Sequence, residues 1–414
     1  MVKSFSNFTN RRFSISGNEY SANMLSFARD DHWKYLRTVL APSYSSKRMR
    51  EMVPLIEDVL KTFEKNLNKI ADSKEATDAT VLFSGYTMDV IASTGFGINV
   101  DSQEDPDSPI VKNARKVFAG DFFRSIPGLS TIFPLLGKML NKIKPGIILG
   151  NMGYFVDFCK ELVEERKKEK NTSTRKDLLQ LMLDAQLEGH EKLDEKIEQE
   201  LKLENITDWR TKRGLTDVEI IAQCMFFFLA GFDTTASTLS FFAHSIAMNP
   251  DESPNYDNVQ KLTYLQMCME ETLRMYPVAV TLTRQAKEDC IIKGMKIPKN
   301  AGVMFSIICL HHDPRYWMEP LKFNPEHFSE ENKAKQIPFT YLPFGGGPRT
   351  CPGMRLAELE FKMAVVQMLR KFRLVACDKT EKKIEFAKAT QLKTKNGIWI
   401  KILHREEEKN ICSQ

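Results

Sequence analysis

The stretch Phe344-Gly345-Gly346-Gly347-Pro348-Arg349-Thr350-Cys351-Pro352-Gly353 is the most informative part of the chain. Three consecutive glycines and a proline do not suit the middle of a helix or strand, so they predict a tight loop whose backbone can approach another group closely. Pro352 suits the first turn of a helix, because its missing N–H would have no partner there. The stretch therefore predicts a loop that places Cys351 at the N-terminus of a helix.

The residues after Cys351 support that helix, because apolar side chains recur at helical spacing at Leu356, Leu359, Met363, Val366 and Leu369. Orphan N–H groups and the helix dipole favour a thiolate at such an N-terminus. A thiolate held by a glycine-rich backbone can serve as a single metal ligand, with Arg349 as a nearby cation. A buried structural cysteine is the simpler alternative, since cysteine is often only a small core residue.

The full pattern Phe-x-x-Gly-x-Arg-x-Cys-x-Gly, from Phe344 to Gly353, resembles the haem-binding loop of the cytochrome P-450 family of haem-thiolate monooxygenases. The resemblance implies haem b (iron protoporphyrin IX) as cofactor, with Cys351 as the axial ligand of the iron and Phe344 and Arg349 at the cofactor. It also implies a mainly α fold, in which residues 1–414 form one large helical domain with small β-sheets.

Composition fits this interpretation. The chain has 414 residues, of which 42% are hydrophobic and 27% charged, as in an ordinary globular protein. Its eight cysteines are scattered, which favours a reducing compartment and argues against structural zinc. The net charge of +5 is mild and both signs are interspersed, so no nucleic-acid partner is indicated. No continuous apolar run reaches the roughly 18 residues that span a bilayer.

Asp30 and Asp31 are expected to cap a helix from about His32 to Leu40, with Trp33 and Arg37 on one face. A tryptophan over the core with an arginine beside it is the simpler interpretation. The string also resembles the family's Trp-x-x-x-Arg helix, which implies that both residues hold a haem propionate. Asn10-Arg11-Arg12 resembles a propionate-binding segment of the microsomal branch, with Arg11 as the contact.

Apolar periodicity predicts helices over 49–70, 80–94 and 155–168. The Thr216-Asp217-Val218-Glu219 capping box predicts the start of a buried helix that ends near Asn249. The apolar segment 122–153 is expected either to form a lid over a substrate pocket or to pack in the core.

Within the buried helix, Ala230-Gly231-Phe232-Asp233-Thr234-Thr235 places polar groups in an apolar environment. A threonine bonding its own i−4 carbonyl is a common structural explanation, but it does not explain a buried aspartate. The string resembles the family's oxygen-activation motif. The resemblance implies that Thr234 and Asp233 deliver protons during O–O cleavage, that Gly231 allows a local groove or bulge, and that Ala230 lies over the haem.

Glu271-Thr272-Leu273-Arg274 places an acid and a base on one helix face, which by itself suggests only a weak surface ion pair. The string resembles the family's Glu-x-x-Arg pair, which implies a buried structural role near the Cys351 loop. The third member of that arrangement is an arginine in the family but His327 here, so we expect this arm to respond to pH.

Residues 276–284 resemble the turn and strand that line the substrate pocket in the same branch, with Arg284 at a propionate. Strands are expected at about 291–297 and 303–308. The adjacent His311 and His312 point apart in a strand or loop and are interpreted as surface histidines. The resemblance implies these pocket residues: Ser26, Phe27, Leu229, Val278, Ala279, Thr281 and Thr283.

The resemblance covers about residues 10–400 and is strongest to the microsomal drug-metabolising and thromboxane-synthase-like branch. It implies insertion of one oxygen atom of O2 into a small apolar substrate, with electrons from NADPH through an NADPH–cytochrome reductase. It also implies the cytoplasmic face of the endoplasmic reticulum membrane. A reductase-independent haem isomerase is an alternative; the Asp233–Thr234 pair argues against it, and NADPH dependence discriminates the two.

Two departures from the family pattern keep a further alternative open. The membrane anchor, first helix and first strands of the family should precede Asn10, and a helix of the family should follow Asp251. The sequence is therefore interpreted as truncated at its N-terminus and lacking one internal helix. A truncated, non-catalytic isoform that binds little haem remains a possible interpretation, and haem stoichiometry would decide.

Overall fold

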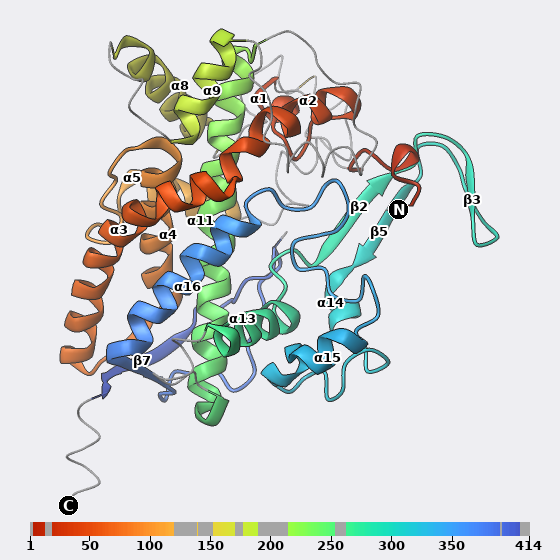
Figure 1. The fold of residues 1–414 in the computed structure, drawn as a ribbon. Helices are drawn as coiled ribbons and strands as arrows, with labels where there is room; N and C mark the ends of the chain where they lie inside the picture. Colours follow the sequence, from red (N-terminus) through yellow and green to blue (C-terminus); the bar gives the residue numbers. More distant parts are fainter. Residues whose placement is uncertain are drawn as a thin grey trace, which may run out of the picture.

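The computed structural model describes residues 3–12, 19–119, 139, 152–169, 177–188, 214–252, 262–389 and 391–405. These residues form a mainly helical structure with small sheets, as predicted from the sequence (Figure 1). The helices used below are α1 (Glu19–Asn23), α2 (Asp30–Leu40), α3 (Ser46–Ser73), α4 (Ala79–Phe96), α5 (Pro109–Ala119), α8 (Gly153–Lys168), α9 (Leu178–Glu188), α11 (Asp217–Met248), α13 (Thr263–Met275), α14 (Ile307–His311), α15 (Glu330–Lys335) and α16 (Met354–Lys371).

The strands of the described residues pair antiparallel in three small sheets. One has the order β1 (Ala76–Asp78), β7 (Trp399–His404), β6 (Phe372–Val375); the others pair β2 (Thr281–Gln285) with β5 (Gly302–Ser306), and β3 (Cys290–Ile292) with β4 (Met295–Ile297).

Both strand predictions need correction. The segment 291–297 is a hairpin and not one strand, because Lys293 (φ 48°) and Gly294 (φ 81°) make a left-handed turn. The strand predicted for 303–308 stops at Ser306, whose hydroxyl accepts the backbone N–H of Cys309 and caps α14.

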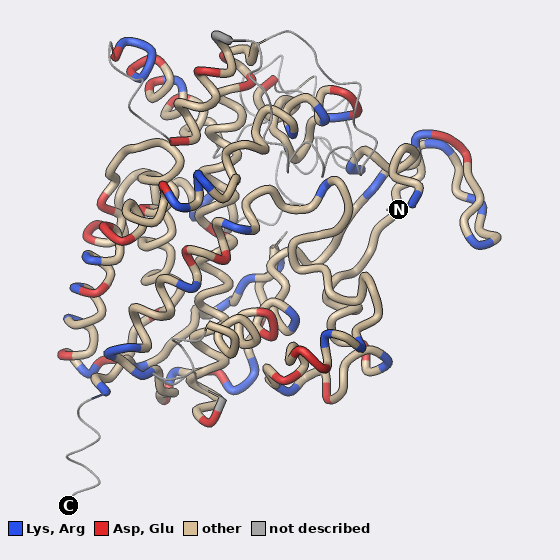
Figure 2. Tube along the Cα trace, viewed as in Figure 1, with Lys and Arg blue, Asp and Glu red and all other residues tan. Residues whose placement is uncertain are grey.

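Helix α11 passes through the middle of the helical part of the molecule (Figure 1). It begins at the predicted capping box, in which the Thr216 hydroxyl and the Glu219 carboxylate each accept a backbone N–H of the other residue. By length and composition α11 could cross a membrane, but 72% of its apolar window is buried within the structure. Figure 2 shows charges of both signs on the surrounding helices and little charge along the middle of α11.

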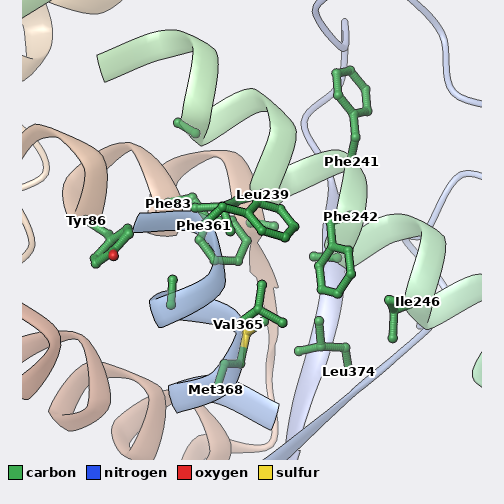
Figure 3. Close-up of a cluster of buried hydrophobic side chains, with 14 of the residues drawn as sticks. Phe83, Tyr86, Leu239, Phe241, Phe242, Ile246, Phe361, Val365, Met368 and Leu374 are labelled. Carbon is green, nitrogen blue, oxygen red and sulfur yellow. The ribbon is translucent and has the colours of Figure 1, made fainter. Parts of the chain in front are cut away.

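The core beside the site joins α4, α11, α16 and β6. Aromatic and aliphatic side chains from these elements interdigitate (Figure 3), and Phe242 of α11 meets Phe361 of α16 edge to face, with ring centroids 5.2 Å apart. The hydroxyl of Tyr86 in α4 donates to the Glu360 carbonyl of α16 at 3.0 Å. This packing fixes α16, and therefore the start of α16, against α11.

The helices predicted from periodicity are present as α3, α4 and α8, each slightly longer than predicted. The capping prediction for α2 is wrong: Asp30 and Asp31 lie in the first turn of the helix, and the N-cap is Arg29, which makes no side-chain capping bond. Most of the segment 122–153, for which a lid was considered, lies outside the described residues.

The N-terminal segment 3–12 lies beside β2 (Figure 1). The backbone N–H of Gln285 donates to the Asn10 carbonyl at 2.8 Å, and that of Lys287 donates to the Asn7 carbonyl at 2.9 Å. The Asn10 side chain accepts the N–H of Asp30 at 2.8 Å. These bonds place Arg11 between β2 and the start of α2.

Candidate haem-binding site

A cavity lies between the middle of α11, the loop before α16 and the turn that precedes β2. It encloses about 1390 Å³ of empty space, open solvent at its mouth included. Its walls are mostly apolar. The cavity brings together eight of the residues predicted from the sequence: Arg11, Ala230, Thr234, Val278, Ala279, Phe344, Arg349 and Cys351.

Cys351 has the predicted setting at the N-terminus of α16. Gly345 (φ 80°) and Gly347 (φ 72°) take left-handed conformations that L-residues with side chains rarely adopt. The backbone N–H of Cys351 donates to the Phe344 carbonyl at 2.9 Å, which closes the loop. Pro352 lies in the turn before the helix and not in its first turn, because α16 starts at Met354 with Gly353 as its N-cap.

The Cys351 side chain is exposed only in the sense that its free surface faces the cavity, since it lines that cavity and is otherwise surrounded by protein. Burial raises the pKa of the Cys351 thiol, although the Gly353 N–H, Arg37 and Arg11 lower it in part. A thiolate at this point therefore needs an additional positive charge, and a coordinated metal ion supplies one.

Three arginines lie close enough together for their charges to interact, and two of them, Arg11 and Arg349, line the cavity. Burial first, and then the like charges of Arg11 and Arg284, lower the pKa of Arg349 to about 8. Burial, and then Arg11, lower the pKa of Arg284 to about 10. Arg349 donates from Nη2 to the Ala28 carbonyl at 2.8 Å, but its Nε and Nη1 are buried without a partner within the described part of the chain.

These observations test whether the site suits a haem. A buried group of like charges with orphaned donors is unfavourable unless an anion joins it. Haem b meets both needs, because its propionates would pair with the arginines and its cationic iron would bind the thiolate of Cys351. The donor set and the apolar walls therefore fit the cofactor that the sequence implies.

Trp33 lies behind Arg349 and not in the cavity wall. Its ring is buried, does not line the cavity, and lies under Arg349, whose guanidinium carbon is 4.3 Å from the ring centroid. Trp33 therefore supports Arg349 by a cation–π contact. Arg37 also does not line the cavity, but it lies near enough to lower the pKa of the Cys351 thiol.

On α11, Thr234 faces the cavity and its hydroxyl donates to the Ala230 carbonyl at 2.7 Å. Helix α11 is continuous from Asp217 to Met248, so no bulge interrupts it at Gly231, which lines the cavity. Gly231 has a packing reason instead: a Cβ there would lie 2.9 Å from Cδ1 of Ile91 in α4. The glycine lets the two helices approach closely beside the cavity.

Asp233 lies on a different face of α11 from Thr234. Its Oδ1 accepts from Nζ of Lys393 at 2.5 Å, in a second, polar pocket that Arg115 also lines. Burial raises the pKa of the Asp233 carboxyl, and Lys393 partly opposes the shift. Its Oδ2 is buried without a partner among the residues described. The structure therefore does not bring the two predicted proton-delivery residues into one cavity.

Sequence reasoning missed Glu360, which is buried on α16 and lines the cavity. Burial raises its carboxyl pKa to about 8, against a smaller opposing effect of a hydrogen bond from Thr235. The available signal was an acidic residue on the apolar face of the predicted helix after Cys351. Lys393 had no comparable signal, because its contact with Asp233 joins residues 160 positions apart.

The Glu271–Arg274 pair is buried as predicted. Arg274 donates from Nε and Nη2 to the Glu271 carboxylate at 2.7 and 2.8 Å. His327 joins it, with Nδ1 3.2 Å from both carboxylate oxygens and Nε2 2.8 Å from the Met318 carbonyl. Both ring nitrogens thus face acceptors, an arrangement that a doubly protonated imidazolium satisfies completely.

Only part of the predicted substrate pocket lines the cavity. Val278 and Ala279 do, whereas Leu229 is buried in the core on another face of α11 and Thr281 is exposed. The other residues predicted for this pocket that do not line the cavity are Ser26, Phe27 and Thr283. Arg284 does not line it either, although its charge acts on Arg349.

The interpretation of His311 and His312 as surface residues is wrong. His311 is fully buried, and His312 is partly buried with Nε2 2.9 Å from the Met275 carbonyl. The described residues contain no group of three or more His, Cys, Asp or Glu side chains that could hold a metal ion. A single thiolate ligand is therefore the metal-binding feature that the described residues offer.

Comparison with known proteins identifies the family of the chain. The cytochrome P450 family model matches residues 1–401. The chain is 35% identical to cytochrome P450 3A14 of Cavia porcellus over a 420-residue alignment that covers 97% of this chain and 80% of that protein. Human cytochrome P450 3A7 is also 35% identical, with the same coverage, and lithocholate 6-beta-hydroxylase of Mesocricetus auratus is 34% identical over 422 residues. The chain thus belongs to the cytochrome P450 family, in a branch that resembles the 3A enzymes.

Proposed function

We propose that this protein is a haem-thiolate monooxygenase that inserts one oxygen atom of O2 into a small apolar substrate. The observation that carries the proposal is the position of Cys351, at the start of a helix and facing a mostly apolar cavity that Arg11 and Arg349 also line, with Arg284 close enough to act on Arg349. We further propose that electrons come from NADPH through a microsomal reductase, and that the protein works at the endoplasmic reticulum membrane.

In this proposal Cys351 ligates the iron, and Arg11, Arg349 and Arg284 neutralise the propionates, with Trp33 and Arg37 in support. The bound haem supplies the activation of O2; the protein contributes ligation, orientation and a dry cavity. Ala230, Val278 and Ala279 line that cavity and would hold an apolar substrate against the cofactor. The named hydroxylase of Mesocricetus auratus suggests a substrate of steroid-like size and apolar character.

Thr234 would hold a proton inside the cavity, and the position of this residue in the cavity wall supports that role. Its present bond to the Ala230 carbonyl uses the hydroxyl hydrogen and leaves the oxygen able to accept. Asp233 would supply protons to it only after its carboxylate leaves Lys393 or through bridging water. We assign both residues to proton delivery on this basis.

The orientation of Asp233 also favours a second candidate function. A haem isomerase that rearranges a peroxide needs neither a reductase nor a proton relay, and here the acidic residue faces away from the cavity. The two functions differ in their requirement for NADPH and in the source of the inserted oxygen.

The discriminating experiment is turnover of a steroid substrate by the purified chain with reductase, NADPH and isotopically labelled O2. We expect one labelled oxygen atom in each product molecule and no product without NADPH. An isomer of an added organic peroxide, formed at the same rate with and without NADPH and with no oxygen transferred to the steroid, would support the isomerase. Failure to form product under either condition, with haem bound, would contradict both.

A further inference from the structure

We propose that His311 is a positioning residue for the Cys351 loop, residues 342–353, which it holds by accepting a hydrogen bond from the backbone N–H of Leu342. Through its other ring nitrogen His311 joins this loop to α13, which carries the buried Glu271–Arg274 pair. Only the expected effect on haem ligation rests on the proposed function. The hydrogen bonds that join His311 to Leu342 and Arg274 do not depend on it.

The geometry defines the state of the imidazole. Nε2 of His311 is 2.9 Å from the Leu342 nitrogen, which can only donate, and Nδ1 is 3.2 Å from the Arg274 carbonyl, which can only accept. The neutral tautomer with hydrogen on Nδ1 is the single form that satisfies both contacts. Burial, opposed in part by the bond to the Arg274 carbonyl, lowers the pKa of His311 to about 3, which agrees with a neutral ring.

The same residue is tied to Arg274 a second time, because Nη1 of Arg274 donates to the His311 carbonyl at 2.7 Å. The imidazole also lies against the ring of Tyr341, with centroids 5.3 Å apart, and the Tyr341 hydroxyl donates to the Glu270 carbonyl at 3.1 Å. His311 is therefore held on several sides, as a residue must be if it positions another.

From Leu342 a series of backbone hydrogen bonds leads to the cysteine. The Leu342 carbonyl accepts the N–H of Gly345 at 3.1 Å, and the Phe344 carbonyl accepts the N–H of Cys351 at 2.9 Å. Since Gly345, Gly346 and Gly347 give this loop little conformational restraint of their own, an external anchor at its first residues has a large effect on where Cys351 points.

The neighbouring histidine provides a matched comparison. His312 lies at the end of the same short helix and is 2.9 Å from another α13 carbonyl, that of Met275, but no hydrogen bond from its side chain reaches the described residues of the Cys351 loop. Loss of His312 thus removes a similar buried contact with α13 and leaves the bond to Leu342 in place.

Two variants of His311 separate its two bonds. An asparagine places a polar atom near the position of Nδ1 but cannot reach Leu342, whereas the longer glutamine places an oxygen near the position of Nε2. We expect amide hydrogen exchange of the peptide containing Leu342 to accelerate by about tenfold in His311→Asn, the effect of losing one buried hydrogen bond. His311→Gln should stay within about twofold of the wild type, and so should His312→Asn.

In the haem-loaded protein, His311→Asn should also increase the fraction of the reduced carbon-monoxide complex that lacks thiolate ligation, and His311→Gln should restore it. Unchanged exchange at Leu342 in a folded His311→Asn protein would overturn the proposal. An equal acceleration of exchange at Leu342 in His311→Gln or in His312→Asn would also overturn it. A wild-type protein that shows no thiolate complex would contradict the proposed function. The role of His311 would still be decided by hydrogen exchange, which can be measured with or without haem.

Discussion

Arg349 lies with its guanidinium carbon 4.3 Å from the ring centroid of Trp33, while its Nε and Nη1 remain buried and unpartnered within the described residues. The indole face supports the cation but cannot accept two directed hydrogen bonds. Arg11 and Arg284 lie close enough to add like charge. An anionic group bound beside these arginines would pair with the unpartnered N–H groups of Arg349 and offset the like charges.

Replacing Arg349 by leucine should weaken haem binding by about tenfold or more, because a charge-assisted bond to a propionate contributes about 1.5–3 kcal/mol. The haem-free protein should not lose stability, since the change removes a buried cation from among like charges. Haem transfer to apomyoglobin and urea unfolding measure the two effects. Arg355→Leu, which changes an exposed arginine bonded to Tyr44 and Ser46, is the control and should leave haem transfer unchanged.

Replacing Thr234 by alanine should uncouple electron use from product formation, with NADPH still consumed and hydrogen peroxide released. The reason is the loss of the hydroxyl that faces the cavity on α11. Ser245→Ala removes a hydroxyl that makes the same kind of i−4 bond on α11, to the Phe241 carbonyl, away from the cavity. Equal product per NADPH in Thr234→Ala, Ser245→Ala and wild type would count against a role in proton delivery.

Glu360 predicts a pH dependence of stability. Its carboxyl pKa is raised by burial from 4.5 to about 8, so between these values the folded protein retains a proton that the unfolded chain releases. This contribution to the free energy of unfolding is fully present below pH 4.5 and is lost as the pH rises through about 8. Each pKa unit corresponds to about 1.4 kcal/mol, so the loss amounts to several kcal/mol at most.

Glu360→Gln should remove that dependence, since an amide does not titrate. The measurement is the free energy of urea unfolding of the wild type and the variant across this pH window. We expect the wild type to lose stability with rising pH relative to the variant. Parallel profiles would show that the Glu360 pKa is not raised in the folded state.

Breaking the buried Glu271–Arg274 pair should cost far more free energy of unfolding than breaking an ion pair at the surface. Arg274→Ala leaves the buried Glu271 carboxylate without its arginine, with only His327 and the backbone N–H of Asn324 beside it, and should cost about 3–5 kcal/mol of unfolding free energy. Arg315→Ala, which breaks the pair between exposed Arg315 and Asp313, should cost less than about 1 kcal/mol. Calorimetry or urea unfolding compares them, and similar costs would contradict the structural role of Glu271 and Arg274.

The local parts of this fold could be predicted from sequence. The capping box at Thr216, the glycine-rich loop and the helix after Cys351 depend on residues close in the chain, and the structure confirms all three. The sequence predictions failed where the position of a side chain depends on residues that are far apart in the chain. Two adjacent histidines are expected at the surface from sequence alone, but His311 is buried because α13 and the Cys351 loop pack around it.

The same distinction explains the site. Motif spacing singled out Cys351, Thr234 and Arg349, and the structure brings all three to one cavity. The direction of Asp233 was not predictable, because it depends on Lys393, which the chain brings back only after the last helix. Glu360 was overlooked because an acid on a predicted helix is usually solvated, and its burial depends on α4 and α11.

The most direct measurement is the reduced carbon-monoxide difference spectrum of the purified chain and of three cysteine variants. We predict a thiolate-ligated haem spectrum for the wild type, for Cys224→Ser in α11 and for Cys377→Ser, and its loss in Cys351→Ser. A thiolate spectrum that persists in Cys351→Ser, or a wild-type protein that binds haem without one, would contradict the assignment of Cys351 as the iron ligand.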